Sequence, residues 1–159
     1  MKTGGNRLLI SVSRHVSAAV AALALCAVTG TAYAQQFVSI SNNVANVRAQ
    51  PTTRSEKLWE LNRGYPLAVT KRQGSWLKVR DFEGDLGWIY RPLTGNTPHH
   101  VVRAKVANLR AAPQTSARLV GKLEQYELLK TVGKRNGWVH VKRNNGQQGW
   151  VAQRLVWGW

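Results

Sequence analysis

The side chains of this sequence that could ligate a metal or transfer a proton are few. Beyond residue 34 the only histidines are His99, His100 and His140. His99 and His100 could hold a metal ion, but adjacent side chains on an extended segment point in opposite directions. A zinc site needs three or four converging ligands, and no second pair stands nearby in the sequence. We therefore expect His99 and His100 to lie in an exposed linker, and His140 to face outward from a strand.

Three alternating carboxylates form the other candidate. Asp81, Glu83 and Asp85 could approach a calcium ion, which prefers oxygen ligands, but the run lacks the full ligand set of a calcium loop. A solvated hairpin tip is the preferred interpretation. The single cysteine, Cys26, lies in the N-terminal segment described below, so a cysteine nucleophile is not expected either. The sequence thus predicts no enzyme, no metal and no cofactor.

The elements that position the remaining candidates come from a duplicated segment. The motif V-A-N-V-R-A-Q-P at residues 44–51 returns as V-A-N-L-R-A-A-P at residues 106–113, which is 62 positions later. Further anchors recur at the same spacing: Trp76 as Trp138, Gly87-Trp88 as Gly149-Trp150, and Leu93 as Leu155. Self-similarity at a fixed period indicates repeated structural units.

Each repeat has the pattern of short β-strands. Apolar residues alternate with polar ones over segments such as Trp76 to Arg80, and Asn145-Gly146 is a strong signal for a tight hairpin turn. Five or six strands in about 55 residues predict a small bent antiparallel barrel. We therefore predict an all-β protein with two small tandem antiparallel barrels after an N-terminal signal peptide. The expected boundaries are 37–93 for the first domain, 94–100 for a short linker, and 101–157 for the second domain.

Tryptophans are the strongest binding candidates. Leu77 and Val79 share one strand face, so Trp76 lies on the other, and Trp138 repeats this arrangement. A tryptophan beside cations can stack on the face of a sugar or a peptide. The sequence leaves open whether these two rings line a ligand groove or pack between the repeats. Trp88 and Trp150 are expected in the cores.

The predicted ligand-binding residues combine aromatic and basic side chains. Arg48 and Arg110 stand in the repeated motif, where each could instead brace a loop. The full candidate set is Arg48, Trp76, Tyr90, Arg110, Lys134, Arg135, Trp138, Lys142 and Arg143.

The first 34 residues have the pattern of a secretory signal. Lys2, Arg7 and Arg14 precede an apolar run over residues 16–28, and residues 32–34 give the small-x-small pattern of a cleavage site. The run is too short to span a bilayer. Acylation of Cys26 is the alternative, but Leu25 stands where a small residue is expected. We predict cleavage after Ala34, a periplasmic or secreted protein, and no transmembrane segment after cleavage.

Charge is distributed unequally between the repeats. The net charge is +4 over residues 35–95 and +9 over residues 96–159. A field of this sign favours acidic partners. For an exported protein these partners are wall polymers, lipopolysaccharide or phospholipid head groups, and not nucleic acid. A basic surface that serves only solubility is the alternative.

The recurring anchors resemble the bacterial SH3 domain family, and this resemblance implies that the two predicted barrels are SH3-like. In the first copy they are Val47-Arg48 with Pro51, the strand opened by Trp76, and Gly87-Trp88-Ile89. The second copy has Leu109-Arg110 with Pro113, the strand opened by Trp138, and Gly149-Trp150-Val151. A signal followed by two such domains is also similar to uncharacterised secreted SH3 proteins of Gram-negative bacteria.

The resemblance implies binding. Domains of this family bind cell-wall peptides or glycans and target attached hydrolases. We therefore expect a non-catalytic module that recognises peptidoglycan or another anionic envelope polymer. The alternative is an interaction protein that docks on a separate envelope enzyme, such as a wall hydrolase, and regulates it.

Overall fold

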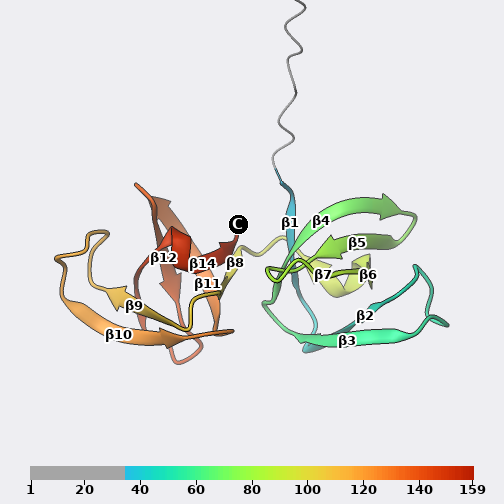
Figure 1. The fold of residues 1–159 in the computed structure, drawn as a ribbon, viewed down its shortest axis with the longest axis horizontal. Coiled ribbons are helices and arrows are strands. Elements are labelled where there is room, and N and C mark those ends of the chain that lie inside the picture. The colour runs from blue at the N-terminus through green and yellow to red at the C-terminus, as the bar shows by residue number, and fades with distance from the viewer. Residues whose placement is uncertain (1–34) are drawn as a thin grey trace, which may run out of the picture. The chain divides into compact units, whose positions relative to one another are not determined.

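Two antiparallel sheets with the same strand order make up the structure, which is a computed structural model that describes residues 35–159 (Figure 1). The predicted signal peptide, residues 1–34, lies outside the described residues. The first sheet is ordered β3-β2-β6-β5-β4-β1-β7, and the second β10-β9-β13-β12-β11-β8-β14. Each strand of the second sheet therefore takes the place of the strand seven earlier. The prediction of two tandem all-β domains is confirmed.

Short strands and two short 3₁₀ turns make up the regular structure of both repeats. The elements of the first repeat are β1 (Phe37–Ile40), β2 (Val44–Arg48), β3 (Lys57–Asn62), β4 (Pro66–Gln73), β5 (Trp76–Arg80), β6 (Leu86–Tyr90), η1 (Arg91–Leu93) and β7 (Thr94–Gly95). Those of the second are β8 (His99–Val102), β9 (Val106–Arg110), β10 (Leu119–Glu124), β11 (Leu128–Arg135), β12 (Trp138–Lys142), β13 (Gln148–Ala152), η2 (Gln153–Leu155) and β14 (Val156–Gly158).

The two hydrophobic cores follow the 62-residue period. Eight of the nine buried residues of the first core have their counterpart in the second core exactly 62 positions later. The first core contains Ile40, Ala45, Val47, Leu61, Leu67, Leu77, Val79 and Ile89 at these positions, together with Val38. Because the strands alternate, every second residue points into the core, and β5 has the burial pattern that this alternation predicts.

The segment 94–100, expected as a linker, contributes to both sheets. Thr94 and Gly95 form β7 and pair with β1, and His99 and His100 begin β8. The expectation that both histidines are exposed is wrong, because β8 is the copy of β1. His100 takes the position of Val38 in that copy and is 1% exposed. Its Nδ1 lies 2.6 Å from Oγ1 of Thr131.

The tryptophans of β6 and β13 do not belong to the two core clusters. Trp88 is 8% exposed and is therefore buried as expected, but it points to the face opposite Ile89. Trp150 is only half-buried. It stacks on His140 with ring centroids 4.8 Å apart. The expectation of a core position for Trp150 is therefore wrong, since Val151 supplies the inward side chain at this end of the strand.

The described residues form one compact unit, in which aromatic contacts join the two repeats. Phe37 of β1 meets Trp157 of β14 edge to face with centroids 5.0 Å apart. The Tyr126 hydroxyl donates to Glu83 Oε1 at 3.2 Å. Within residues 35–159, no helix has the length and hydrophobicity needed to cross a membrane.

Candidate functional site

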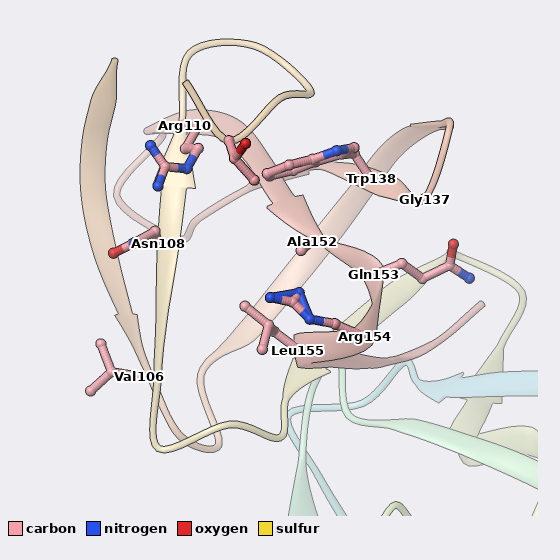
Figure 2. A pocket seen from close by; sticks show the side chains of 10 residues that line it. Val106, Asn108, Arg110, Gly137, Trp138, Ala152, Gln153, Arg154 and Leu155 are labelled. Carbon is pink, nitrogen blue, oxygen red and sulfur yellow. The ribbon is translucent and has the colours of Figure 1, made fainter. Parts of the chain in front are cut away.

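A cavity of about 620 Å³ opens on the second repeat, beside Trp138 (Figure 2). Its wall comes from β9, from the start of β12, and from the end of β13 with the following η2 turn. The lining residues are Val106, Asn108, Arg110, Thr115, Gly137, Trp138, Ala152, Gln153, Arg154 and Leu155. A volume of this size is within the range of small-molecule sites, about 300–1,000 Å³.

Strand alternation places Trp138 at the cavity. Val139 is fully buried in the core, so Trp138 points to the opposite face of the sheet and is half-buried. Its cross-strand neighbours are Arg135 on β11 and Ala152 on β13. Because Ala152 has only a methyl group, it covers little of the Trp138 ring, while Arg135 places a cation on the other side of that ring.

Arg110 braces a loop and also lines the cavity. Its NH1 donates to the Ala117 carbonyl at 2.8 Å. The counterpart Arg48 donates in the same way to the Ser55 carbonyl at 2.7 Å. The motif arginine of each repeat thus fixes the loop that follows β2 or β9. Arg110 keeps further N–H donors, because a guanidinium carries five and NH1 uses one of them on Ala117.

A second guanidinium at the cavity comes from Arg154. Figure 2 shows this side chain directed into the space that Asn108, Arg110 and Trp138 surround, whereas Gln153 is directed out of it. No carboxylate occurs among the lining residues, so the cavity has a positive potential. Trp138 with two guanidinium groups can hold a flat or apolar ligand that carries an anionic group.

Sequence reasoning missed several lining residues. Arg154 was outside the candidate set because it follows the last strand of the repeat, and Asn108 and Thr115 are common loop and strand residues. The sequence does contain a signal for two of them, because Asn46 and Thr53 recur as Asn108 and Thr115 at the 62-residue period. Polar residues that recur outside the core positions can be recognised as parts of a repeated surface.

Trp76, the equivalent of Trp138 in the first repeat, has a different neighbour. Trp76 and Tyr90 are cross-strand neighbours, and their ring centroids lie 5.4 Å apart. Tyr90 occupies the position that Ala152 has in the second repeat. These two predicted site residues are therefore brought together, but they contact each other.

The predicted cations are spread over the second sheet. Arg135 adjoins Trp138, whereas Lys142 lies at the far end of β12. Lys134 lies close enough to His100 for its charge to act on that ring. Arg143 is bound in a bidentate pair with Glu127, with Nε 2.6 Å from Oε1.

Burial keeps His99 and His100 of β8 uncharged at neutral pH. Desolvation, reinforced by the charge of Lys134, lowers the pKa of His100 to about 4. Burial also lowers the pKa of His99, whose Nδ1 contacts the Thr97 carbonyl and Ser39 Oγ. The two rings diverge as expected, since His100 contacts Thr131 instead.

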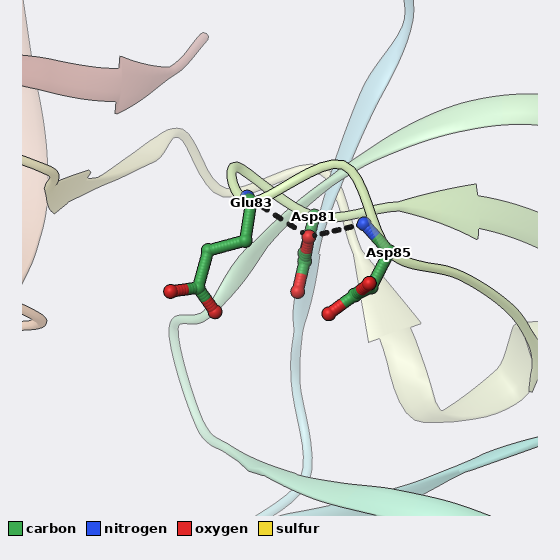
Figure 3. A group of neighbouring side chains, drawn as sticks. All are labelled: Asp81, Glu83 and Asp85. Atoms are coloured by element: carbon green, nitrogen blue, oxygen red, sulfur yellow. Dashed lines mark hydrogen bonds between the residues drawn. The ribbon is translucent and has the colours of Figure 1, made fainter.

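The carboxylates Asp81, Glu83 and Asp85 gather at the β5–β6 hairpin (Figure 3), where ligand atoms of all three lie within 4.8 Å of one another. Asp81 is buried, and its Oδ1 accepts hydrogen bonds from the backbone N–H groups of Glu83, Gly84 and Asp85 at 2.9–3.0 Å. Asp81 therefore organises the loop, and only Glu83 and Asp85 are exposed as expected for a hairpin tip.

The fold and the cavity define a pair of small all-β domains with an open surface site on the second. The bacterial SH3 domain family matches residues 41–95 and again residues 105–156. The chain belongs to this family and carries two of its domains in tandem.

Individual relatives are more distant. The putative N-acetylmuramoyl-L-alanine amidase YrvJ of Bacillus subtilis is 23% identical over 134 residues, which cover 77% of this chain and 26% of the amidase. An NlpC/P60 family protein from Bacillus cereus is 17% identical with a TM-score of 0.35, over 77% of this chain and 56% of that one. NlpC2 from Trichomonas vaginalis is 11% identical with a TM-score of 0.37, over 78% and 48%. The chain thus spans about a quarter of the curated relative and about half of these two structures.

Proposed function

We propose that this protein is an exported, non-catalytic module that binds peptidoglycan or another anionic polymer of the cell envelope. Membership of the bacterial SH3 domain family supports a role at the cell wall. The match to the putative amidase covers 26% of that protein, so most of the amidase has no counterpart in this chain. Binding, and not hydrolysis, is therefore the activity that we carry over.

The cavity beside Trp138 is the observation that carries the proposal. It combines an aromatic face with the guanidinium groups of Arg110 and Arg154, and its lining holds no carboxylate. Aromatic faces stack on sugar and peptide groups, while guanidinium groups pair with carboxylates through two parallel hydrogen bonds. Both features suit a wall polymer built of sugars and acidic peptides.

Export is part of the same proposal. The N-terminal pattern predicts cleavage after Ala34, so the protein from the periplasmic or secreted fraction should begin at Gln35. Its intact mass measures this directly. A species that retains Cys26 with an attached lipid would contradict it.

Retention on purified wall sacculi tests the function. The protein should pellet with sacculi, and added salt should reduce retention, because the Debye length falls from about 10 Å at 0.1 M to about 3 Å at 1 M. Trp138→Ala should reduce retention at every salt concentration, since stacking does not depend on charge. Val132→Ala, which shortens a 53% exposed apolar side chain elsewhere on the second repeat, is the control.

The same experiment separates binding of the polymer from docking on an envelope enzyme. A polymer-binding module is retained by sacculi stripped of protein. Retention that requires an added protein extract would instead support the alternative function, an interaction protein that docks on an envelope enzyme and regulates it. Failure to bind in both conditions would refute the proposed function.

A further inference from the structure

The lining positions of this cavity have counterparts in the first repeat, and the two sets can be compared position by position. Six of its ten lining residues are identical 62 positions earlier. The four that differ are Gly137, Ala152, Gln153 and Arg154, which replace Ser75, Tyr90, Arg91 and Pro92. Two of these four exchanges change what the site can accept.

The first exchange changes what stands beside the tryptophan ring. Tyr90 stands directly across the strand pair from Trp76, with its ring centroid 5.4 Å away, so it covers part of the surface that a ligand would need. Ala152 stands across from Trp138 in the same register and presents only a methyl group. The difference in side-chain volume is left as open space, which is part of the cavity.

The second exchange decides the charge of the site. Pro92 has no side-chain hydrogen-bond donor, whereas Arg154 brings a fork of N–H groups to the cavity (Figure 2). Arg110 adds further donors, because only its NH1 is used by the Ala117 carbonyl. Two guanidinium groups without a neighbouring carboxylate are suited to a planar oxyanion.

We propose that the first repeat fills its own site with Tyr90, and that the second repeat, opened by Ala152 and charged by Arg154, binds a short wall peptide by its free carboxylate. The protein then has one peptide site, although it has two domains of the same family. This inference rests on the proposed wall-binding function and adds to it the ligand group, the number of sites and the residue that controls access.

A peptide fits the lining better than a phosphate-bearing polymer. The Asn108 amide and the Thr115 hydroxyl can pair with the N–H and carbonyl groups of a peptide backbone. Trp138, Val106 and Leu155 offer an apolar surface to aliphatic side chains. A phosphodiester chain would use the guanidinium groups but would leave these apolar and amide-type partners without a role.

Calorimetric titration of the full chain with a synthetic tetrapeptide, Ala-Glu-Lys-Ala, tests the proposal. Wild-type protein should bind one peptide per chain, and the same peptide with a C-terminal amide should bind more weakly. Arg154→Gln should weaken binding of the free acid by about tenfold or more, the cost of losing a charge-assisted hydrogen bond. It should also remove the preference for the acid over the amide. Lys71→Gln, which removes one exposed charge from the first repeat, is the charge-matched control.

Exchanging Ala152 and Tyr90 between the repeats is the more decisive part of the experiment. Ala152→Tyr should abolish peptide binding, because it rebuilds the pair that the first repeat already tolerates at Trp76 and Tyr90. Conversely, Tyr90→Ala combined with Pro92→Arg should raise the stoichiometry from one peptide per chain to two. Circular dichroism melts verify that each variant folds. If Ala152→Tyr does not fold, the proposal is still tested by the affinity of Arg154→Gln and by the stoichiometry of the double variant.

Each outcome supports or overturns the inference. Two equal sites in wild-type protein, or unchanged binding by Ala152→Tyr, would overturn it even if sacculi retain the protein. Binding of glycerol phosphate in place of the tetrapeptide would also overturn it, in favour of a phosphate polymer. If neither sacculi nor tetrapeptide binds, the proposed function fails, and this inference fails with it.

Discussion

His100 brings a titratable ring into a core position that an aliphatic residue fills in the first repeat. The counterparts of His100 and Thr131 are Val38 and Val69, so an apolar pair has been replaced by a hydrogen-bonded pair with 2.6 Å between Nδ1 and Oγ1. A buried polar group is tolerated when it has a partner. The exchange preserves packing but makes the interior sensitive to pH.

The stability of the second repeat should fall in mild acid. The pKa of His100 is lowered to about 4 in the folded state, against 6.5 in the unfolded chain, so only the unfolded state takes up the proton between these values. This contribution is complete above pH 6.5 and is lost as the pH falls toward 4, by about 2–3 kcal/mol. His99, whose pKa is also lowered, acts in the same direction. Urea unfolding at pH 7 and pH 4.5 measures the change.

A double variant isolates the histidine from the carboxylates that titrate in the same range. His100→Val with Thr131→Val restores the apolar pair of the first repeat and should lose most of the pH dependence at nearly unchanged stability at pH 7. His100→Val alone leaves the half-buried Thr131 hydroxyl without its partner and should cost about 0.5–1.5 kcal/mol, the usual net contribution of a hydrogen bond. A pH dependence equal to that of wild type in the double variant would show that His100 is not responsible.

Gly149 is required by close packing of β13 against β9. A Cβ built there would lie 2.7 Å from Leu109 Cγ and 2.9 Å from the Arg110 carbonyl oxygen. Gly149→Ala should therefore destabilise the protein by about 1–3 kcal/mol, the usual cost of overpacking. Gly133→Ala is the control, since nothing lies within 4 Å of its Cβ, and it should stay within about 0.5 kcal/mol. Thermal melts compare the two, and equal melting temperatures would contradict the packing argument.

At the scale of single elements, equivalent hairpins are stabilised by different chemistry. The β5–β6 loop is closed by Asp81, which accepts three backbone N–H groups. At the same position of the β12–β13 loop, Arg143 pairs with Glu127 and donates to Gln147 Oε1 at 2.8 Å. The β5–β6 loop is thus held by a side chain that bonds its own backbone, whereas the β12–β13 loop is held by an ion pair to the segment before β11.

Asp81→Ala should be costly although the residue lies in a loop. It removes the side-chain acceptor shared by three backbone N–H groups, and the loss should be about 1–3 kcal/mol. Asp85→Ala removes the same charge from an exposed position of the same hairpin and should have little effect. Denaturant unfolding of both variants provides the comparison. If they lose the same stability, net charge and not loop closure is the cause.

At the scale of the whole molecule, the two repeats share one fold but differ in charge. The second repeat has a net charge of +9 and the first +4. The position of the charges relative to the Trp138 cavity should matter more than their number, because screening limits their reach to about 8–10 Å near physiological ionic strength.

Two triple variants with the same net charge test this. One neutralises the exposed cations Arg118, Arg135 and Arg154, which follow Ala117 on the loop held by Arg110, adjoin Trp138 and line the cavity, respectively; the other neutralises Arg54, Arg63 and Lys71 of the first repeat. Both remove three positive charges, but the second-repeat variant should lose more retention on sacculi and more of its salt dependence. Equal losses would mean that only the net charge attracts the polymer.

The sequence by itself determined the architecture. Alternation and the 62-residue period predict two all-β domains, inward positions such as Leu77 and Val79, and outward positions such as Trp76 and Trp138, because strand periodicity and core burial are local consequences of residue order. The burial of His100 was also implied by the repeat, since it falls on the position of Val38. The linker expected over residues 94–100 hides this correspondence, because it separates His100 from the second repeat.

Only the tertiary structure decided which surface residues meet. Arg135, Trp138 and Ala152 are neighbours because β11, β12 and β13 pair in one register, and Arg154 joins them because η2 turns the chain back beside β9. The pairing of Arg143 with Glu127 likewise joins residues 16 positions apart. Such contacts depend on strand register and loop course, which are set by the packing of the whole domain and are not encoded in the spacing of any one segment.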